Sequence, residues 1–197
     1  MAARKTVIIL NGPPGVGKDV QALAITKAMR FYRKPVQMQI KSALYAETLL
    51  HYGLDNECYV DMFIDRSYKE HPSAFFGGLS PRQALQYVSE GICKPRYGKD
   101  YFGRISAQEV ALCNNDFIIF SDGGFIEEVD RISEKADVIL IRLRKEGVDF
   151  TGDTRTYLYP EGIAKHADYV ITDGDIVGDT QRLIDLILKL EEEKLNG

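Results

Sequence analysis

The chain has 197 residues, 45% hydrophobic and 27% charged, and a formal net charge of −4 at pH 7. This length fits one globular domain over residues 1–197, and the apolar fraction excludes a chain that is disordered throughout. No apolar run reaches the roughly 18 residues of a membrane-spanning helix, so we expect a cytoplasmic protein with no membrane segment. The net acidity disfavours a dedicated nucleic-acid-binding protein, although local basic clusters can still bind phosphates.

The first expected element is a buried strand over residues 6–10, which is β-branched and ends in a Gly/Pro-rich turn. The turn matches the phosphate-binding pattern G-x-x-x-x-G-K at every fixed position. Glycines let the backbone point its N–H groups at phosphate oxygens, and the helix that follows adds a partial positive charge. We expect ATP to bind Gly12, Pro14, Gly15, Val16, Gly17, Lys18, Asp19 and Val20, with Lys18 neutralising the β- and γ-phosphates.

Asp19 departs from the common form of this pattern, which has Ser or Thr after the lysine. The hydroxyl normally ligates Mg²⁺, but a carboxylate is also a hard oxygen ligand, so Asp19 can keep the metal role. Asp19 could instead hold the ion through a water molecule, or only cap the helix. We expect that helix to bury Ala22, Ile25 and Met29.

Further strands are expected at residues 35–40, 116–121, 137–143 and 169–172, and helices at 42–52, from 80 to about 91, from about 126, and at 181–195. Strands that alternate with helices predict an α/β sandwich of three layers, with a mostly parallel five-stranded sheet covered on both faces. Ser80, Pro81 and Gln83 form the pattern of a helix start with a capping box. The loosely patterned interval at about 54–104 fits an inserted acceptor-binding segment.

Ligands of such sheets bind beyond the carboxyl ends of the strands. Polar or flexible residues follow all five expected strands: the Gly-rich loop, Lys41, Asp122, Arg144, and the pair Asp173 and Gly174. Asp122 could ligate Mg²⁺ through water, orient the attacking oxygen or bind a sugar hydroxyl. Its alternative role is to cap the helix that begins near Ile126.

Arg82 occupies the second position of its helix, where the helix dipole disfavours a cation. A bound phosphate would reverse this penalty, because a guanidinium can bind phosphate through two hydrogen bonds. An ordinary solvated arginine is the alternative. Arg66 and Arg104 lie in the same basic segment, and a solvated role explains each of them equally well.

Residues 144–160 contain glycines and arginines in the position of a lid after the fourth strand. Arginines there would close over the transferring phosphoryl group, where neutralising charge is the main catalytic effect. Closure would also exclude water as a competing acceptor. The alternative is a short exposed loop with solvated charges.

Several motifs together resemble the bacteriophage-type deoxynucleoside monophosphate kinases of the P-loop kinase superfamily. They are Gly-Lys-Asp at 17–19, Ser-Pro-Arg-Gln at 80–83, Ser-Asp-Gly-Gly-Phe-Ile-Glu-Glu at 121–128 and Gly-Asp-Thr-Arg at 152–155. The stretch 167–175 also looks like the family's last strand and the turn after it. The resemblance implies Mg²⁺-dependent transfer of the ATP γ-phosphoryl group to a deoxynucleoside monophosphate.

The resemblance also assigns roles to residues. The catalytic candidates are Lys18, Asp122, Arg144 and Arg155, and the metal candidates are Asp19 and Asp122. The resemblance assigns Arg82, Asp122 and Glu128 to the acceptor. Lys41, at a strand end, and Arg66 and Arg104, in the basic segment, are further acceptor candidates. Arg144 would also contact ATP, and Asp173 and Gly174 would flank the adenine. Arg142 is an alternative to Arg144, because residues two apart share one face of a strand.

Other functions stay open at this point. Related phage kinases phosphorylate 5-hydroxymethyluracil within DNA, and another small phosphorylated compound could be the acceptor. A nucleotide-sensing module that binds ATP without transfer is a non-catalytic alternative. A homodimer is possible, and the cytoplasm would be that of a host cell if the chain is phage-encoded.

Overall fold

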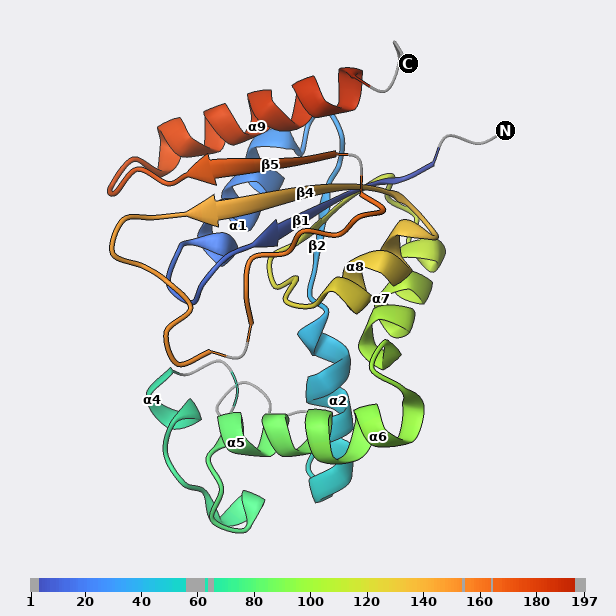
Figure 1. The fold of residues 1–197 in the computed structure, drawn as a ribbon, viewed down its shortest axis with the longest axis vertical. Helices are drawn as coiled ribbons and strands as arrows, with labels where there is room; N and C mark the ends of the chain where they lie inside the picture. Colours follow the sequence, from blue (N-terminus) through green and yellow to red (C-terminus); the bar gives the residue numbers. More distant parts are fainter. Residues whose placement is uncertain (1–3, 56–62, 64–65, 154, 164, 194–197) are drawn as a thin grey trace. The chain divides into compact units, whose positions relative to one another are not determined.

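A computed structural model describes residues 4–55, 63, 66–153, 155–163 and 165–193. The chain divides into two compact units (Figure 1). The first unit comprises Met1–Gln39 and Ser106–Gly197, and the second, Ile40–Ile105, interrupts it in the sequence. Among the described residues, no helix is long and apolar enough to cross a lipid bilayer.

The first unit is built around a five-stranded sheet whose neighbouring strands all pair in parallel. Across the sheet, the strands are β2 (Val36–Met38), β3 (Phe117–Phe120), β1 (Thr6–Asn11), β4 (Asp137–Arg144) and β5 (Lys165–Val170). In this register, Ile8 of β1 lies beside Ile119 of β3 and Ile139 of β4. The predicted parallel α/β sheet is confirmed.

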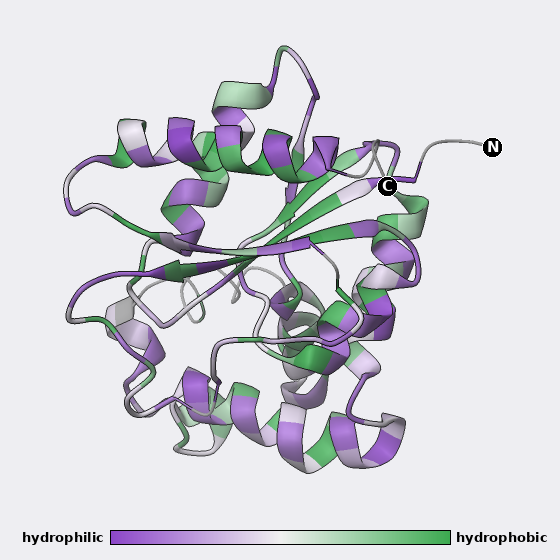
Figure 2. Cartoon of the chain, turned by 45° about the horizontal axis from the view of Figure 1, so that its top comes forward, coloured by the Kyte–Doolittle hydropathy of each residue, from purple (hydrophilic) through white to green (hydrophobic). Residues whose placement is uncertain are grey.

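Helices cover both faces of this sheet, which gives the three predicted layers (Figure 1). The helices α1 (Lys18–Met29) and α9 (Ile176–Glu192) lie on one face, and α8 (Ile126–Ser133) lies on the other. Because both faces are covered, the central strands are apolar almost throughout, and Figure 2 shows them largely in green.

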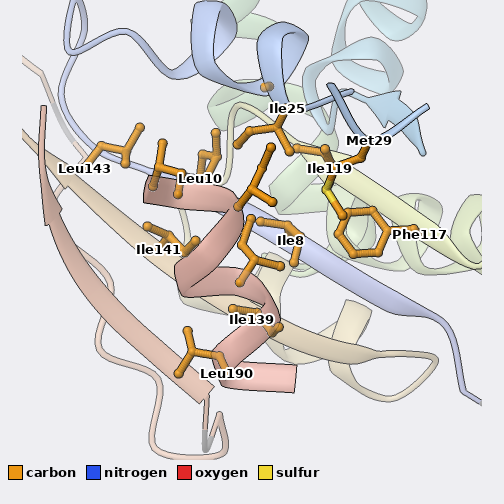
Figure 3. Packing of buried hydrophobic residues seen from close by; sticks show 14 of the residues in the cluster. Ile8, Leu10, Ile25, Met29, Phe117, Ile119, Ile139, Ile141, Leu143 and Leu190 are labelled. Atoms are coloured by element: carbon orange, nitrogen blue, oxygen red, sulfur yellow. The ribbon is translucent and has the colours of Figure 1, made fainter. Parts of the chain in front are cut away.

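Alternate side chains of the strands fill the core between the sheet and the helices α1 and α9 (Figure 3). They pack against Ala22, Ile25 and Met29 of α1, the three residues expected to be buried there. The strand residues of this cluster are Ile8, Leu10, Phe117, Ile119, Ile139, Ile141 and Leu143. Burying one such side chain contributes about 1.5–3 kcal/mol to stability, so this core fixes the strand ends that carry the site.

Two predicted boundaries in the first unit are wrong. The last strand spans Lys165–Val170 instead of residues 169–172, and its side chains alternate between half-buried and exposed. Such alternation is expected of an edge strand, where charged residues interrupt the apolar pattern. The last helix begins at Ile176 instead of 181, because the Asp175 side chain caps it by accepting a hydrogen bond from the Gly178 N–H group.

The second unit is helical. Its elements are α2 (Lys41–Tyr52), α4 (Arg66–Lys69), η2 (Ala74–Phe76), α5 (Pro81–Gln86), the π-helical η3 (Tyr87–Cys93) and α6 (Lys94–Tyr97), and α7 (Tyr101–Leu112) crosses the boundary into the first unit. The prediction that α2 stops at Gly53 is confirmed, since Gly53 has a φ of 66°. Apolar side chains of α2, η2 and α5 form a separate core, in which the rings of Tyr45 and Phe63 stack 4.9 Å apart.

The helix start at Ser80 has the predicted capping box. Ser80 Oγ accepts a hydrogen bond from the Gln83 N–H group at 3.3 Å, and the Gln83 side chain accepts one from the Ser80 N–H group at 2.9 Å. The prediction that this helix ends near Gly91 is wrong, because helical structure runs through η3 into α6. There the Lys94 N–H group bonds to Ser89 O, five residues back, and this wider turn accommodates Pro95.

Candidate functional site

The loop between β1 and α1 has the backbone that its glycines predict. Gly15 and Gly17 have φ values of 84° and 102°, which residues with side chains rarely adopt. A Cβ atom on Gly12 would lie 2.6 Å from Leu143 O at the end of β4, so only glycine fits there. The loop is therefore packed tightly against the carboxyl end of the sheet, as a phosphate-binding loop requires.

The start of α1 and the side chain of Lys18 complete this loop. Among the residues that the structure describes, no side chain caps the first turn of α1. A helix start without a cap presents N–H groups whose hydrogen bonds an anion can accept. Lys18 Nζ donates hydrogen bonds to Gly12 O at 2.6 Å and Pro13 O at 2.8 Å. The ammonium group is thus held at the loop, where phosphate oxygens would compete with these carbonyl groups.

Asp19, in the first turn of α1, lies beside the end of β3. Ser121 follows β3 directly, and its Oγ donates a hydrogen bond to Asp19 Oδ1 at 2.6 Å. Asp19 is exposed, whereas Ser121 is 1% exposed. Ser121 was predicted as the end of a strand and as the first residue of the motif at 121–128, without a role of its own.

Asp122, Glu128 and Arg155 gather near the loop that follows β3. Arg155 packs on Gly124, where a Cβ atom would meet Arg155 Cδ at 2.8 Å. Hydrogen bonds from Arg155 to Asp153, at 2.8 and 2.5 Å, raise the pKa of the arginine despite its burial. The negative charges of Asp122 and Glu128 raise this pKa further, which places both near the guanidinium. A predicted lid arginine and two predicted acceptor residues thus lie in one neighbourhood.

Glu128 has a structural role at the start of α8. Its Oε2 accepts hydrogen bonds from the N–H groups of Gly124 and Phe125, both at 3.1 Å, and it is 9% exposed. This arrangement fixes the turn after Asp122. Glu128 was predicted to bind the acceptor, and these contacts show it holding the backbone beside the candidate site.

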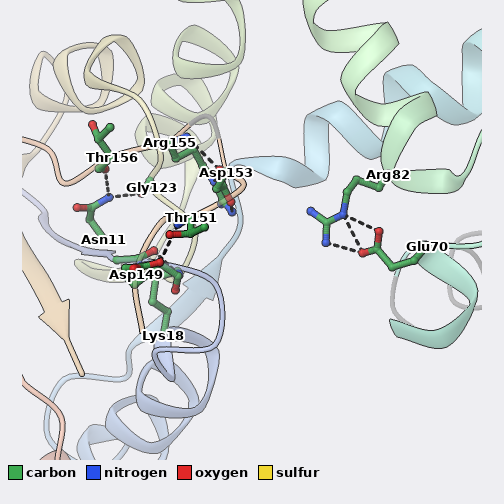
Figure 4. Close-up of polar contacts among 12 residues, drawn as sticks. Asn11, Lys18, Glu70, Arg82, Gly123, Asp149, Thr151, Asp153, Arg155 and Thr156 are labelled. Carbon is green, nitrogen blue, oxygen red and sulfur yellow. Dashed lines mark hydrogen bonds and ion pairs between the residues drawn. The ribbon is translucent and has the colours of Figure 1, made fainter. Parts of the chain in front are cut away.

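Asn11, the last residue of β1, joins three segments at the base of the site (Figure 4). Its Nδ2 donates to Gly123 O at 3.1 Å and to Thr156 O at 3.3 Å, and its Oδ1 accepts from the Leu158 N–H group at 3.1 Å. Asn11 is 1% exposed. Asn11 lies just past the strand predicted at residues 6–10, and no role was predicted for it. The available signal was a polar residue directly after a buried apolar run.

Arg142 and Arg144 share one carboxylate, that of Asp168 on β5. Arg142 is 5% exposed, hydrogen-bonds to Asp168 and Leu158 O, and lies 4.4 Å from the ring centre of Tyr159. The Arg144 side chain is 39% exposed and bonds to Asp168 Oδ2 and the Tyr159 hydroxyl, both at 3.0 Å. Burial raises the pKa of Asp168, but the hydrogen bonds from both arginines outweigh it and lower the pKa. Arg144 is therefore the more accessible of the two.

The predicted adenine-flanking turn follows β5. Asp173 accepts a hydrogen bond from Lys145 at 2.7 Å, which lowers the pKa of Asp173, and Gly174 has a φ of 78°. This ion pair connects the turn after β5 to the start of the predicted lid after β4.

The other acceptor candidates belong to the second unit. Lys41 is the first residue of α2, and Arg66 is the first residue of α4, although its side chain lies outside the described residues. Arg104 bonds to Asp100 at 2.7 Å and to Tyr97 O at 2.7 Å, so its visible contacts are local.

Arg82 forms a two-point ion pair with Glu70 (Figure 4). Its Nε donates to Glu70 Oε1 at 2.8 Å, and its Nη2 lies 2.7 Å from the same oxygen. This carboxylate offsets the unfavourable position of a cation at a helix start. The position of Arg82 at a helix start predicted an anion beside it, and in the structure that anion is the Glu70 carboxylate and not a bound phosphate.

The donor set fits a magnesium ion that also binds phosphates. Mg²⁺ usually takes one or two protein carboxylates, waters and phosphate oxygens instead of an all-protein cage. Within the described part of the chain, no three His, Cys, Asp or Glu side chains form such a cage. Asp19 and Asp122, the predicted metal residues, are carboxylates at the loop and at the end of β3.

No protein-family model matches the sequence, and no protein of curated function is similar to it. Among solved structures, a gluconokinase from Sinorhizobium meliloti 1021 is similar, with 14% identity, 99% of both chains covered and a TM-score of 0.53. The APS kinase CysC of Mycobacterium tuberculosis, in complex with AMPPNP and APS, has 11% identity, coverage of 94% of this chain and 98% of that chain, and a TM-score of 0.49. The likeness to the gluconokinase shows that the chain has the same α/β fold as that kinase.

Proposed function

We propose that the protein is a kinase that transfers the γ-phosphoryl group of ATP to a (deoxy)nucleoside monophosphate in the presence of Mg²⁺. The observation that carries this proposal is the loop Gly12–Asp19, in which Lys18 and the open start of α1 lie at the carboxyl end of a parallel sheet. Such a loop binds the phosphates of a nucleotide.

The residues around this loop support transfer in preference to binding alone. Asp122 follows β3, the strand that pairs with β1, and Arg155 packs on Gly124 near this carboxylate. A sensing module would need neither a carboxylate nor an arginine there, whereas phosphoryl transfer depends on positioning and on neutralising charge. In this proposal Asp122 contacts the acceptor and Arg155, with Arg144, faces the transferred group.

The chain's own side chains have three tasks in the proposed reaction. The bond from the γ-phosphorus to its bridging oxygen breaks, ADP leaves with the electron pair, and an oxygen of the acceptor phosphate forms the new bond. Lys18 binds the β- and γ-phosphates, and Arg144 and Arg155 neutralise charge on the transferring group. Asp19 and Asp122 would hold Mg²⁺, which supplies further charge neutralisation when bound.

A motif in the second unit supports the proposed class of acceptor. The capped helix start at Ser80–Gln83, with Arg82 at its second position, matches the corresponding motif of the deoxynucleoside monophosphate kinases that the sequence resembles. The proposal assigns Lys41, Arg66, Arg82 and Arg104 to the acceptor side.

The test is an ADP-release assay with Mg²⁺ and ATP against a panel of acceptors. The panel contains the deoxynucleoside and nucleoside monophosphates, DNA that contains 5-hydroxymethyluracil, and gluconate. Stimulation by one or a few monophosphates is the expected result and gives the base and sugar preference. Stimulation only by the modified DNA or only by gluconate would replace the proposed acceptor, and ATP binding without any stimulation would contradict the kinase proposal.

A further inference from the structure

The hydroxyl and the carboxylate of a usual P-loop metal site stand in exchanged positions in this chain. In P-loop enzymes, a Ser or Thr after the loop lysine and an Asp from a strand end hold Mg²⁺ together. Here Asp19 follows Lys18, and Ser121 directly follows β3, the strand that pairs with β1. The carboxylate is therefore on the loop and the hydroxyl is at the strand end.

The two exchanged side chains are in direct contact. Ser121 Oγ donates to Asp19 Oδ1 at 2.6 Å, the short distance typical of a hydroxyl bonded to an ionised carboxylate. Ser121 is 1% exposed and is fixed by the register in which Phe120 pairs with Ile9. Within the described part of the chain, the bond from Ser121 is the one hydrogen bond or ion pair of the Asp19 side chain. A rigid hydroxyl thus orients an exposed carboxylate at the phosphate-binding loop.

We propose that Asp19 and Ser121 form a reversed metal pair, in which Asp19 ligates Mg²⁺ directly and Ser121 is the positioning residue that orients it. The proposal rests on the proposed function, since the ion would bind together with the nucleotide phosphates. It also gives different roles to the two metal candidates: Asp19 ligates the ion, and Asp122 contacts the acceptor.

The exchange has an electrostatic consequence that an ordinary P-loop lacks. The negative charge of Asp19 lies where a neutral hydroxyl is usual, next to the site of anionic phosphates. Without the metal, Asp19 repels the nucleotide; with the metal, the same charge attracts the cation that the nucleotide carries. The pair therefore makes nucleotide binding depend on the divalent ion.

The test compares the dissociation constant of ADP with Mg²⁺ and with EDTA by titration calorimetry, and measures Mn²⁺ binding by electron paramagnetic resonance. Asp19→Asn is expected to weaken Mg²⁺–ADP binding by at least about tenfold, the effect typical of losing a metal-site group, while metal-free ADP binds equally well or more tightly. Asp130→Asn, an exposed aspartate on α8, is the matched control and changes neither value.

Ser121→Ala is expected to weaken Mg²⁺–ADP and Mn²⁺ binding by about tenfold. In a protein that already carries Asp19→Asn, the same substitution should weaken binding little further, because Ser121 acts through Asp19. Ser106→Ala is its control, because Ser106 is also fully buried and its hydroxyl has no hydrogen-bond partner among the described residues. Thermal unfolding checks that both variants fold. The double variant Asp19→Ser with Ser121→Asp restores the usual arrangement, so it should bind Mg²⁺–ADP more tightly than Asp19→Ser alone.

The outcomes separate this inference from the proposed function. Equal losses with and without metal in Asp19→Asn, or a loss of metal binding in Asp122→Asn but not in Asp19→Asn, would overturn the reversed pair while leaving a nucleotide site that needs Lys18. Absence of ADP binding by the unaltered protein, with or without metal, would overturn the proposed function and the pair together.

Discussion

Lys18 is held by the carbonyl groups of its own loop, Gly12 O and Pro13 O. These hydrogen bonds keep a flexible ammonium group near the place where phosphates would bind, so little reorganisation is needed when a nucleotide arrives. They also mean that the lysine contributes to the shape of the loop, and a test of its role must separate folding from chemistry.

Lys18→Ala is expected to lower kcat by about 10²–10³-fold, the loss typical of removing one charge-stabilising group, while the fold is retained. The structural reason is that α1 is held in the core by the burial of Ala22, Ile25 and Met29, which does not involve the ammonium group. Steady-state kinetics and thermal unfolding measure the two effects. Lys27→Ala, an exposed lysine on the same helix, is the control, and full activity in Lys18→Ala would refute the loop's assignment.

Asp179 is a buried carboxylate that ties β5 to α9. It is 0% exposed and accepts hydrogen bonds from the Tyr169 hydroxyl at 2.7 Å, the Thr172 N–H group at 2.8 Å and Arg182 at 2.8 Å. Burial raises the pKa of Asp179, but these hydrogen bonds outweigh it, so the pKa lies below the ordinary 3.8. A lowered pKa in the folded state means that the unfolded chain binds the proton more readily.

The stabilisation from Asp179 is therefore present above about pH 4 and is lost as the pH falls through its lowered pKa. We expect Asp179→Asn to lower the free energy of unfolding at pH 7 by about 2 kcal/mol, because charged hydrogen bonds are lost in a buried place. Urea unfolding between about pH 3 and pH 7, roughly the range in which carboxylates titrate, measures the free energy of unfolding of the variant and of the unaltered protein. The difference between the two should shrink at low pH. Asp185→Asn, at an exposed position on α9, should have the same free energy of unfolding as the unaltered protein. A constant difference across this range would contradict the assigned pKa direction.

At the scale of elements, the sequence predicts the parts of the fold that local physics determines. The strand of residues 6–10, the glycine loop and the capped start at Ser80 depend on short-range patterns and are found where they were predicted. The strand β5 was misplaced because Lys165, His166 and Asp168 break its apolar pattern. The charge of Asp168 is explained only by Arg142 and Arg144 on β4, a partnership that no local pattern reveals.

In the candidate site, too, contacts between residues far apart in the sequence could not be predicted from local patterns. The loop residues could be predicted because all their roles follow from one short motif. The contacts of Asp19 with Ser121 and of Arg155 with Gly124 join residues that are far apart in the sequence, so only the register of the sheet brings them together. Asn11 was missed for this reason, because its three partners lie on segments after β3 and β4.

Asn11 connects β1 to Thr156 and Leu158, which lie within the predicted lid of residues 144–160, and its loss should affect both segments. Asn11→Ala would leave two carbonyl groups and one N–H group without a partner in a buried place, so we expect a loss of about 3 kcal/mol in the free energy of unfolding. Chemical unfolding measures it, with Asn114→Ala at an exposed position as the control. A change within about 0.5 kcal/mol, the range of ordinary surface substitutions, would show that these hydrogen bonds do not hold the segment.

At the scale of the whole molecule, the proposed donor and acceptor residues divide between the two units. The ATP candidates lie in the unit that contains the sheet, and the basic acceptor candidates lie in Ile40–Ile105, which has its own core. Substitutions in the two units should therefore change different Michaelis constants. The ion pair of Arg82 and Glu70 allows this division to be tested with substitutions of opposite effect.

Arg82→Ala is expected to raise the KM of the acceptor by about tenfold and to leave the KM of ATP unchanged, because a guanidinium–phosphate contact of about 1.5–3 kcal/mol is lost. Glu70→Gln should do the opposite and lower the acceptor KM by about two- to fivefold. Its carboxylate competes with the phosphate for Arg82, and an exposed ion pair is worth up to about 1 kcal/mol. Arg96→Ala, an exposed arginine of the same unit, is the control for net charge. Two results would contradict this role: a change only in the KM of ATP in Arg82→Ala, or a higher acceptor KM in Glu70→Gln. Either result would mean that Arg82 does not bind the acceptor phosphate. Its place at the helix start would then be explained by Glu70 alone.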